Sequence, residues 1–174
     1  MSVVGRRLEI DLFIGANRWP ARAARIEDLD QLVELLGILF AQETEFAPDA
    51  QKQRRALSRI LGDASIGRIY VVREGEQVLG MCSLLYTLST AEGGKAAWLE
   101  DFVVRPERRG RGIGRTLLAY AVAQAHAEGI LRISLLTDAE NERAQELYRS
   151  VGFSHSPMRA MRCTKGTMST SASV

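Results

Sequence analysis

The sequence contains few cysteines and few aromatic residues, and neither sign of charge dominates it. Its 174 residues include two cysteines, Cys82 and Cys163, both in apolar surroundings and without metal-ligand spacing. This excludes a disulfide-rich scaffold and indicates reduced thiols, as expected in a reducing cytosol. The formal net charge of +2 is too small to indicate nucleic-acid binding on its own.

Long hydrophobic runs are also missing. No apolar segment approaches the roughly 20 residues that would span a bilayer, and residues 1–7 lack the apolar core of a signal peptide. The hydrophobic share of 46% and the charged share of 25% are those of an ordinary globular protein. We therefore expect one cytoplasmic domain that has no membrane partner.

The hydrophobic pattern predicts a single domain of strands and helices over residues 19–163. Strands are expected at 21–25, 70–72, 77–86, 98–104, 131–137 and 153–163, and helices at 28–40, 50–61, 113–128 and 141–151. Asp28 is the expected N-cap of the first helix. Residues 1–18 are expected to be an N-terminal extension or an extra strand, and the Ser/Thr-rich residues 164–174 a disordered tail.

The order of these elements predicts the fold class. Hairpins join the strands before residue 98, whereas the helix at 113–128 connects the strands at 98–104 and 131–137. A strand, helix and strand in this order imply a parallel pair with a right-handed crossover. We therefore expect an α/β (α+β) protein, in which about four helices flank a mixed, mostly antiparallel sheet with one parallel crossover.

A loop rich in glycine and arginine precedes the helix at 113–128. Glycines at three alternate positions bring bare backbone amides to the start of a helix, and arginines surround them: Gly110, Gly112, Gly114, Arg109, Arg111 and Arg115. Such a helix N-terminus favours an anion, above all a phosphate. A P-loop would need Gly-Lys-Ser/Thr, and a Rossmann unit would need Gly-x-Gly-x-x-Gly near its beginning, so neither nucleotide motif fits.

Two motifs together resemble the GNAT superfamily of N-acetyltransferases. Arg109, Gly112 and Gly114 match the three fixed positions of the family's acetyl-CoA loop, Gln/Arg-x-x-Gly-x-Gly/Ala. Residues 141–153, Asn-Glu-Arg-Ala-x-x-Leu-Tyr-x-x-x-Gly-Phe, resemble the second signature of the family. The order and separation of the two motifs are more specific than either motif alone, and the resemblance covers about residues 20–163.

The resemblance implies an enzyme that transfers acetyl from acetyl-CoA directly to an amine, without a metal. It implies that the donor is bound by main-chain groups of the strand, by amides of the loop and by side chains: Phe102, Val103, Val104, Arg109, Gly110, Arg111, Gly112, Ile113, Gly114, Arg115, Asn141 and Tyr148. In the family the asparagine steadies the cofactor and the tyrosine hydroxyl lies near the sulfur. Tyr148 is therefore the candidate general acid for the CoA thiolate.

Glu100 and Asp101 interrupt an otherwise apolar strand. Alternation sends them to opposite faces, and a buried carboxylate is costly unless it is paired or used, so at least one should face the cleft. The run around Glu100 is similar to the fourth strand of spermidine/spermine acetyltransferases, in which the glutamate is the proposed base. Glu100, acting directly or through a water, is therefore the candidate that deprotonates the amine.

The sequence leaves the acceptor open, because a small amine and a protein amino group would both suit the motifs. Glu43, Glu45 and Phe46 lie between the first two helices and could border the acceptor site, although an exposed acidic turn explains them equally well. One alternative is a catalytically silent protein that binds acetyl-CoA as a sensor or partner module. Another is nucleic-acid binding through the arginine loop, which we do not expect. Homodimerisation is possible through an edge strand.

Overall fold

A computed structural model describes residues 19–42 and 47–163 of the chain. The expected N-terminal extension at 1–18, the expected tail at 164–174 and the acidic turn at 43–46 lie outside these residues. The description below therefore concerns the predicted domain and most of its connections.

Five strands form one sheet in the order β1-β2-β3-β4-β5. Their bounds are β1 (Ala21–Ala23), β2 (Gly67–Glu74), β3 (Gln77–Ser89), β4 (Gly94–Val104) and β5 (Arg132–Leu135). The first four strands are antiparallel neighbours, whereas β4 and β5 are parallel. Gly75, with φ of +55°, forms the tight turn between β2 and β3. The mixed sheet with one parallel pair is confirmed.

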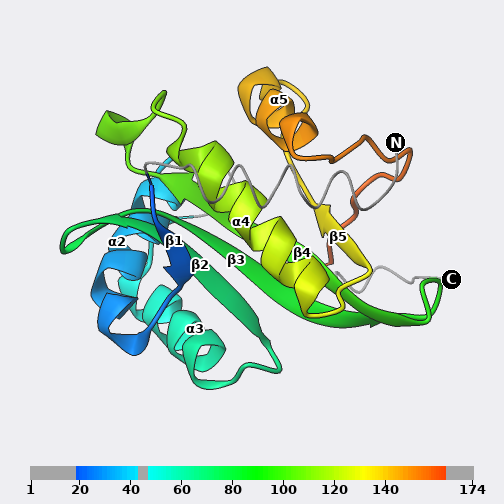
Figure 1. Ribbon diagram of the computed structural model, residues 1–174, viewed down its shortest axis with the longest axis horizontal. Helices are drawn as coiled ribbons and strands as arrows, with labels where there is room; N and C mark the ends of the chain where they lie inside the picture. The colour runs from blue at the N-terminus through cyan, green and yellow to red at the C-terminus, as the bar shows by residue number, and fades with distance from the viewer. Residues whose placement is uncertain (1–18, 43–46, 164–174) are drawn as a thin grey trace, which may run out of the picture.

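Four α-helices cover the two faces of this sheet (Figure 1). They are α2 (Leu29–Phe40), α3 (Ala50–Gly62), α4 (Ile113–Ala127) and α5 (Glu142–Ser150), with short 3-10 turns η1 (Ile26–Asp28) and η2 (Pro106–Arg108). The helix α4 is the crossover between β4 and β5, and it lies across one face, while α2 and α3 pack together on the other. Among the described residues no helix is both long and apolar enough to cross a membrane.

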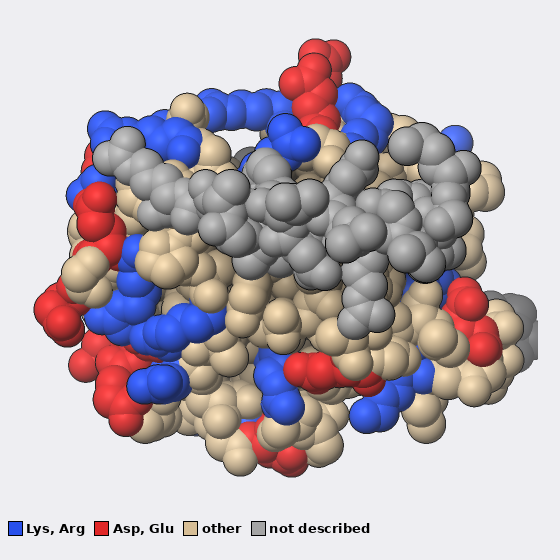
Figure 2. Space-filling model, in the orientation of Figure 1, with Lys and Arg blue, Asp and Glu red and all other residues tan. Residues whose placement is uncertain are grey.

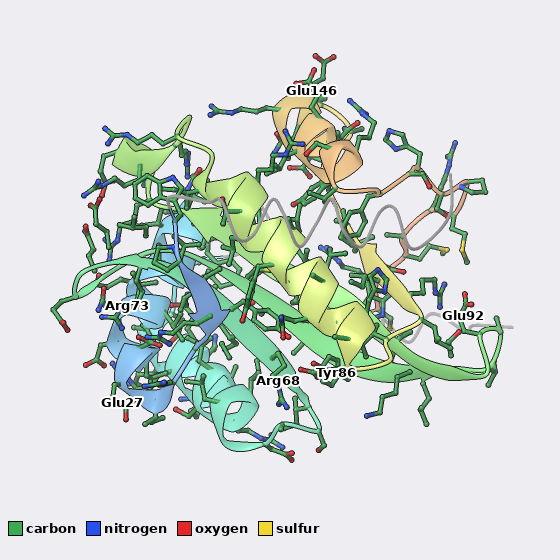
Figure 3. The ribbon with its side chains drawn as sticks, in the orientation of Figure 1. Glu27, Arg68, Arg73, Tyr86, Glu92 and Glu146 are labelled. Carbon is green, nitrogen blue, oxygen red and sulfur yellow. The ribbon has the colours of Figure 1, made fainter. Side chains whose placement is uncertain are left out.

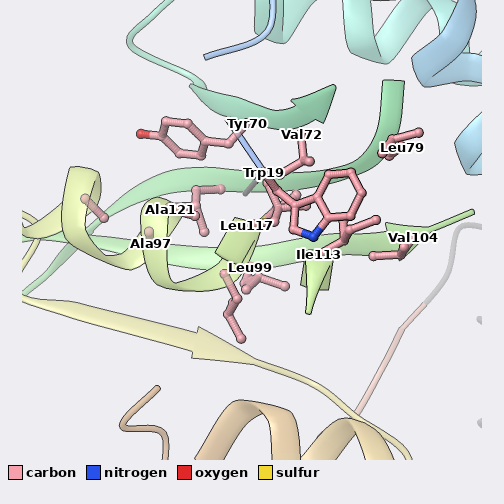
Figure 4. Packing of buried hydrophobic residues seen from close by; sticks show 14 of the residues in the cluster. Trp19, Tyr70, Val72, Leu79, Ala97, Leu99, Val104, Ile113, Leu117 and Ala121 are labelled. Carbon is pink, nitrogen blue, oxygen red and sulfur yellow. The ribbon is translucent and has the colours of Figure 1, made fainter. Parts of the chain in front are cut away.

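The core has two layers, one on each face of the sheet. The layer under α4 includes Trp19, which Figure 4 shows beside Val72, Val104 and Ile113. The layer under α2 and α3 includes Leu32, Leu35, Leu57, Ile69, Val71, Val78, Met81 and Val103. Because alternate residues of each strand enter different layers, membership of a layer tells which face of the sheet a side chain occupies.

The predicted strand at 153–163 is wrong. This segment is irregular, and Met158 and Met161 are 82% and 96% exposed. Pro157 has no backbone N–H to offer a sheet, and the apolar residues of the segment do not alternate, so no strand face could be buried. In the described part of the chain β5 therefore ends the sheet on this side.

Asp28 stands at the expected N-cap position of α2, but its side chain does not cap the helix. Its fully buried carboxylate instead accepts hydrogen bonds from Arg22, Arg73 and the amide of Arg25. Figure 3 labels Arg73 beside this junction. Burial alone would raise the pKa of Asp28, but these partners hold it below its ordinary value. The residue thus joins β1 and β2 to the start of α2.

Candidate functional site

The strands β4 and β5 separate halfway along β4. Pairing runs from Ala96 with Arg132 to Leu99 with Leu135, and β5 ends there. The strand β4 continues to Val104 and stays paired with β3 on its other side. Over residues 100–103 the edge of β4 therefore has no strand beside it in the described chain. Its main-chain groups can bind an extended ligand as a further strand would.

A β-bulge lies where the two strands separate. The register of β3 and β4 shifts between Cys82 and Leu84, so that Ser83 faces two residues of β4, Glu100 and Asp101. Leu99 and Phe102 both pack against the α4 side of the sheet, with two residues between them. The alternation that predicted opposite faces for the two carboxylates therefore fails at this point.

Asp101 is held in place by Ser83. The Ser83 hydroxyl donates to Asp101 Oδ2 at 2.6 Å, and the Asp101 amide donates to Ser83 Oγ at 3.0 Å. Burial raises the pKa of Asp101, the Ser83 hydrogen bond offsets part of the rise, and the charge of Glu100 adds to it. Glu100 itself is exposed. Two adjacent carboxylates, one of them desolvated, favour a cation between or beside them.

The loop before α4 has the backbone of an anion site. Gly110 and Gly112 have φ of +77° and +83°, and a side chain at either position would extend into open space. The first hydrogen bond of the helical ladder runs from the Thr116 amide to the Gly112 carbonyl at 3.0 Å. The amides of Ile113 and Gly114 precede this hydrogen bond and lie at the positive end of the helix dipole.

Gly114, the third glycine, serves packing. A Cβ atom at this position would lie 3.3 Å from Phe102 Cζ and 3.4 Å from Leu147 Cδ2. The first turn of α4 therefore fits closely between β4 and α5, and this contact brings the glycine loop next to the open edge of β4.

Several arginines near the loop have partners within the protein. Arg105 and Arg108 form ion pairs with Glu34 and Glu74 at 2.9 and 2.8 Å. Arg109 donates from Nε to the Val104 carbonyl at 3.0 Å and from Nη2 to Gln42 at 3.2 Å. Acidic and basic side chains alternate along the left margin of the molecule in Figure 2. Much of the arginine density in the sequence therefore has a structural explanation.

The indole of Trp19 donates to the Arg111 carbonyl at 2.9 Å and ties the loop to the core. Because this bond spans 92 positions of the chain, no local pattern could reveal it. Ser83 was likewise missed by the sequence reasoning, although a polar residue within the apolar run of β3 is a visible signal.

Tyr148 lies on α5 and contacts the open edge of β4 at Phe102, while Asn141 is the N-cap residue of the same helix. The Tyr148 ring makes edge contacts with Phe102 and Phe153 at centroid distances of 6.1 and 5.9 Å. Burial, with a smaller contribution from Cys82, raises the pKa of Tyr148 to about 12. Asn141 caps α5, since its Oδ1 accepts from the Ala144 amide at 3.1 Å.

The structure thus brings together most of the residues that the sequence singled out. Phe102 and Tyr148 are in contact, Gly114 packs on Phe102, and the glycine loop begins the helix that covers β4. The side chain of Arg109 points instead to Val104 and Gln42. Within residues 19–42 and 47–163, no three His, Cys, Asp or Glu side chains are grouped as metal ligands.

The chain is similar in sequence and in fold to proteins named as acetyltransferases. The aminoalkylphosphonate N-acetyltransferase of Salmonella typhimurium is 29% identical over 138 residues, 79% of this chain and 86% of the relative. The amino-acid acetyltransferase of Ectopseudomonas mendocina is 31% identical over 147 residues, 84% of this chain but 30% of the relative. A solved structure named a possible acetyltransferase from Clostridium difficile 630 shares the fold, with a TM-score of 0.75 at 22% identity over 84% of this chain and 97% of that one.

A family profile covers most of the domain. Residues 30–153 match the Acetyltransferase (GNAT) family, and this range includes the open edge of β4, the glycine loop and α5. The chain belongs to the GNAT family of acetyltransferases.

Proposed function

We propose that this protein transfers the acetyl group of acetyl-CoA to the nitrogen of an amine. The observation that carries the proposal is the open edge of β4 beside the bare N-terminus of α4. An extended chain that ends in a pyrophosphate needs both features, main-chain partners for the chain and amides for the phosphates. Acetyl-CoA has this shape, and its thioester supplies an activated acetyl group.

The donor-binding residues follow from this placement. The edge of Phe102, Val103 and Val104 would bind the pantetheine arm, and the amides of residues 110–115 would bind the pyrophosphate. The positive φ of Gly110 and Gly112 supports the second assignment, because the loop turns there without a side chain in the way. The Arg109 side chain donates to the Val104 carbonyl at the start of the loop. The Oδ1 atom of Asn141 is used in the helix cap, so its Nδ2 group would donate to a carbonyl oxygen of the cofactor arm.

The carboxylates of β4 assist removal of a proton from the acceptor ammonium. An alkyl ammonium group ionises near 10 and must lose a proton before its nitrogen can attack. In the proposal Asp101 takes this proton, since its raised pKa makes it a stronger base than an ordinary carboxylate at neutral pH. The sequence predicted Glu100 for this role; because Glu100 is exposed, we assign to it the electrostatic support of the ammonium.

Tyr148 acts on the leaving group. When the nitrogen attacks the thioester carbonyl, a C–N bond forms and the C–S bond breaks, and the electron pair goes to sulfur. The raised pKa of Tyr148 keeps its phenol protonated, so that it can donate to this sulfur as the general acid that the sequence predicts. Its ring contact with Phe102 holds it beside the open edge of β4.

Binding of acetyl-CoA, measured by calorimetry, tests the donor site. Gly112→Asp should weaken binding at least a hundredfold, about 2.7 kcal/mol, because it places a negative charge where phosphate would lie. It also puts a side chain on a residue with φ of +83°. Gly75→Asp is the matched control, a substitution at another positive-φ glycine, in the hairpin of β2 and β3.

Unchanged affinity in Gly112→Asp would refute the donor site. If the protein binds acetyl-CoA tightly but releases no CoA when any amine is added, the result would instead support the alternative of a silent sensor. Turnover with an amine supports the enzyme.

A further inference from the structure

The structure also bears on the kind of amine, and this inference rests on the proposed function. Tyr148, α5 and the glycine loop all lie on the α4 side of β4, where Tyr148 and Gly114 meet Phe102. If they hold the donor and its sulfur, the nitrogen reaches the thioester carbonyl from the opposite side. The acceptor therefore approaches across the α2 side of the sheet.

Trp98 is the large apolar side chain on that approach. Its neighbours Ala97 and Leu99 belong to the core under α4, so alternation points Trp98 to the other face. It is 43% exposed, and it is paired across the sheet with the half-buried Leu85. Asp101 is three positions further along β4, which is about 10 Å along a strand. The apolar surface of Trp98 thus lies about 10 Å from the Asp101 carboxylate, a distance that a small amine can span.

Among the described residues, two carboxylates, Glu100 and Asp101, lie side by side at the bulge of β4. Burial and the charge of Glu100 raise the pKa of Asp101. Arg105 is engaged by Glu34 and by the Val78 carbonyl, at 2.9 and 2.8 Å. Within the part of the chain that the structure describes, Arg105 is therefore not available as a counter-ion beside Asp101.

Arg132, on β5 beside Ala96, is the next basic residue along this face. Its guanidinium is held by Glu92 at 3.6 Å and by Ser89 at 3.3 Å. Because these partners hold it at the far end of the pairing of β4 and β5, it does not offer a counter-ion for an anionic group beside Asp101.

We propose that the acceptor is an amine with an apolar, uncharged body, whose ammonium lies at Glu100 and Asp101 and whose body lies on Trp98. A carboxylate or phosphate on the acceptor would lie next to the two carboxylates, and their repulsion disfavours it. Trp98 binds the apolar body of the amine and so affects KM, whereas Asp101 takes the proton from the reacting nitrogen.

The test compares 2-phenylethylamine with phenylalanine, which adds only a carboxylate, and with propylamine, which lacks the ring. With acetyl-CoA saturating, kcat/KM for 2-phenylethylamine should exceed that for phenylalanine at least tenfold. Trp98→Ala should raise the KM for 2-phenylethylamine about tenfold and leave its kcat within twofold. The same variant should leave the KM for propylamine unchanged, and Trp98→Phe should restore most of the affinity.

Leu88→Ala, at a side chain that is 78% exposed near the end of β3, is the control and should change no constant. Equal use of phenylalanine and 2-phenylethylamine would overturn this inference and leave acetyl transfer to amines in place. An equal rise in KM for both 2-phenylethylamine and propylamine in Trp98→Ala would also overturn this inference. If protein that binds acetyl-CoA acetylates none of these three amines but acetylates others in a wider panel, this inference fails and the proposed function stands; both fail if no amine in the panel is acetylated.

Discussion

Replacing Tyr148 by phenylalanine removes one oxygen atom from the centre of the proposed site. The ring contacts with Phe102 and Phe153, at 6.1 and 5.9 Å, do not involve that oxygen and should persist. The variant should therefore fold as the parent does and bind acetyl-CoA with nearly unchanged affinity. Any loss of turnover then reports on the hydroxyl group itself.

Two pKa values indicate how the Tyr148 hydroxyl contributes to kcat. Burial raises the pKa of Tyr148 to about 12, whereas a thiol titrates near 8.5. Complete proton transfer from this phenol to a CoA thiolate is thus uphill by about 3.5 units, or about 5 kcal/mol. A hydrogen bond to the developing charge on sulfur carries most of the effect, and losing such a donor costs roughly a hundredfold to a thousandfold in kcat.

The assay is steady-state release of CoA at saturating acetyl-CoA, from pH 6 to 10. Tyr148→Phe should lower kcat by the same factor throughout this range, because a phenol with a pKa of about 12 stays protonated across it. Tyr86→Phe is the control, since the Tyr86 hydroxyl binds Glu128 at the C-terminal end of α4, where Figure 3 labels it. A kcat in Tyr148→Phe within threefold of the parent would refute the role of this hydroxyl.

Two further predictions concern carboxylates. Asp101→Asn should lower kcat/KM at least tenfold, and more than Glu100→Gln, yet it should leave the melting temperature at pH 7 unchanged or higher. The reason is that a raised carboxyl pKa destabilises the folded protein above that pKa; a melting temperature several degrees lower would contradict this. Asp28→Asn should destabilise the fold by about 3–5 kcal/mol in urea at pH 7, because two arginines lose a buried partner. The lowered pKa of Asp28 means that the parent keeps this contribution above the ordinary carboxyl pKa of 3.8 and loses it as the pH falls through the lowered value. The difference between parent and variant should therefore shrink in acid, and an equal difference at pH 3 would count against the buried ion pair.

Much of the fold could be predicted because local patterns decide it. The stripe of α2 and α4, the hairpin at Gly75 and the single crossover after β4 are all visible as periodicity and turn residues. The segment 153–163 was predicted as a strand from its apolar residues, but Pro157 and the broken alternation prevent pairing. The role of Asp28 was also mistaken, because a capping residue and a buried ion-pair partner look alike in sequence.

The candidate site was predictable in its backbone and less so in its side chains. The positive φ of Gly110 and Gly112 agrees with the expected turn into a helix. The bulge at Glu100 and Asp101 depends on which β3 residue lies opposite, and register is a property of two strands at once. The partners of the arginines are similarly distant, since Arg105 and Glu34 are 71 positions apart. Spacing alone could not assign them.

Acetyl transfer itself can be measured by incubating the purified protein with acetyl-CoA and 2-phenylethylamine and following both products. Mass spectrometry should show N-acetylated amine, with one CoA thiol released for each acetyl group transferred. Gly112→Asp should abolish both signals at the same acetyl-CoA concentration. Release of CoA without acetylated amine, or equal product from Gly112→Asp, would contradict the proposed function.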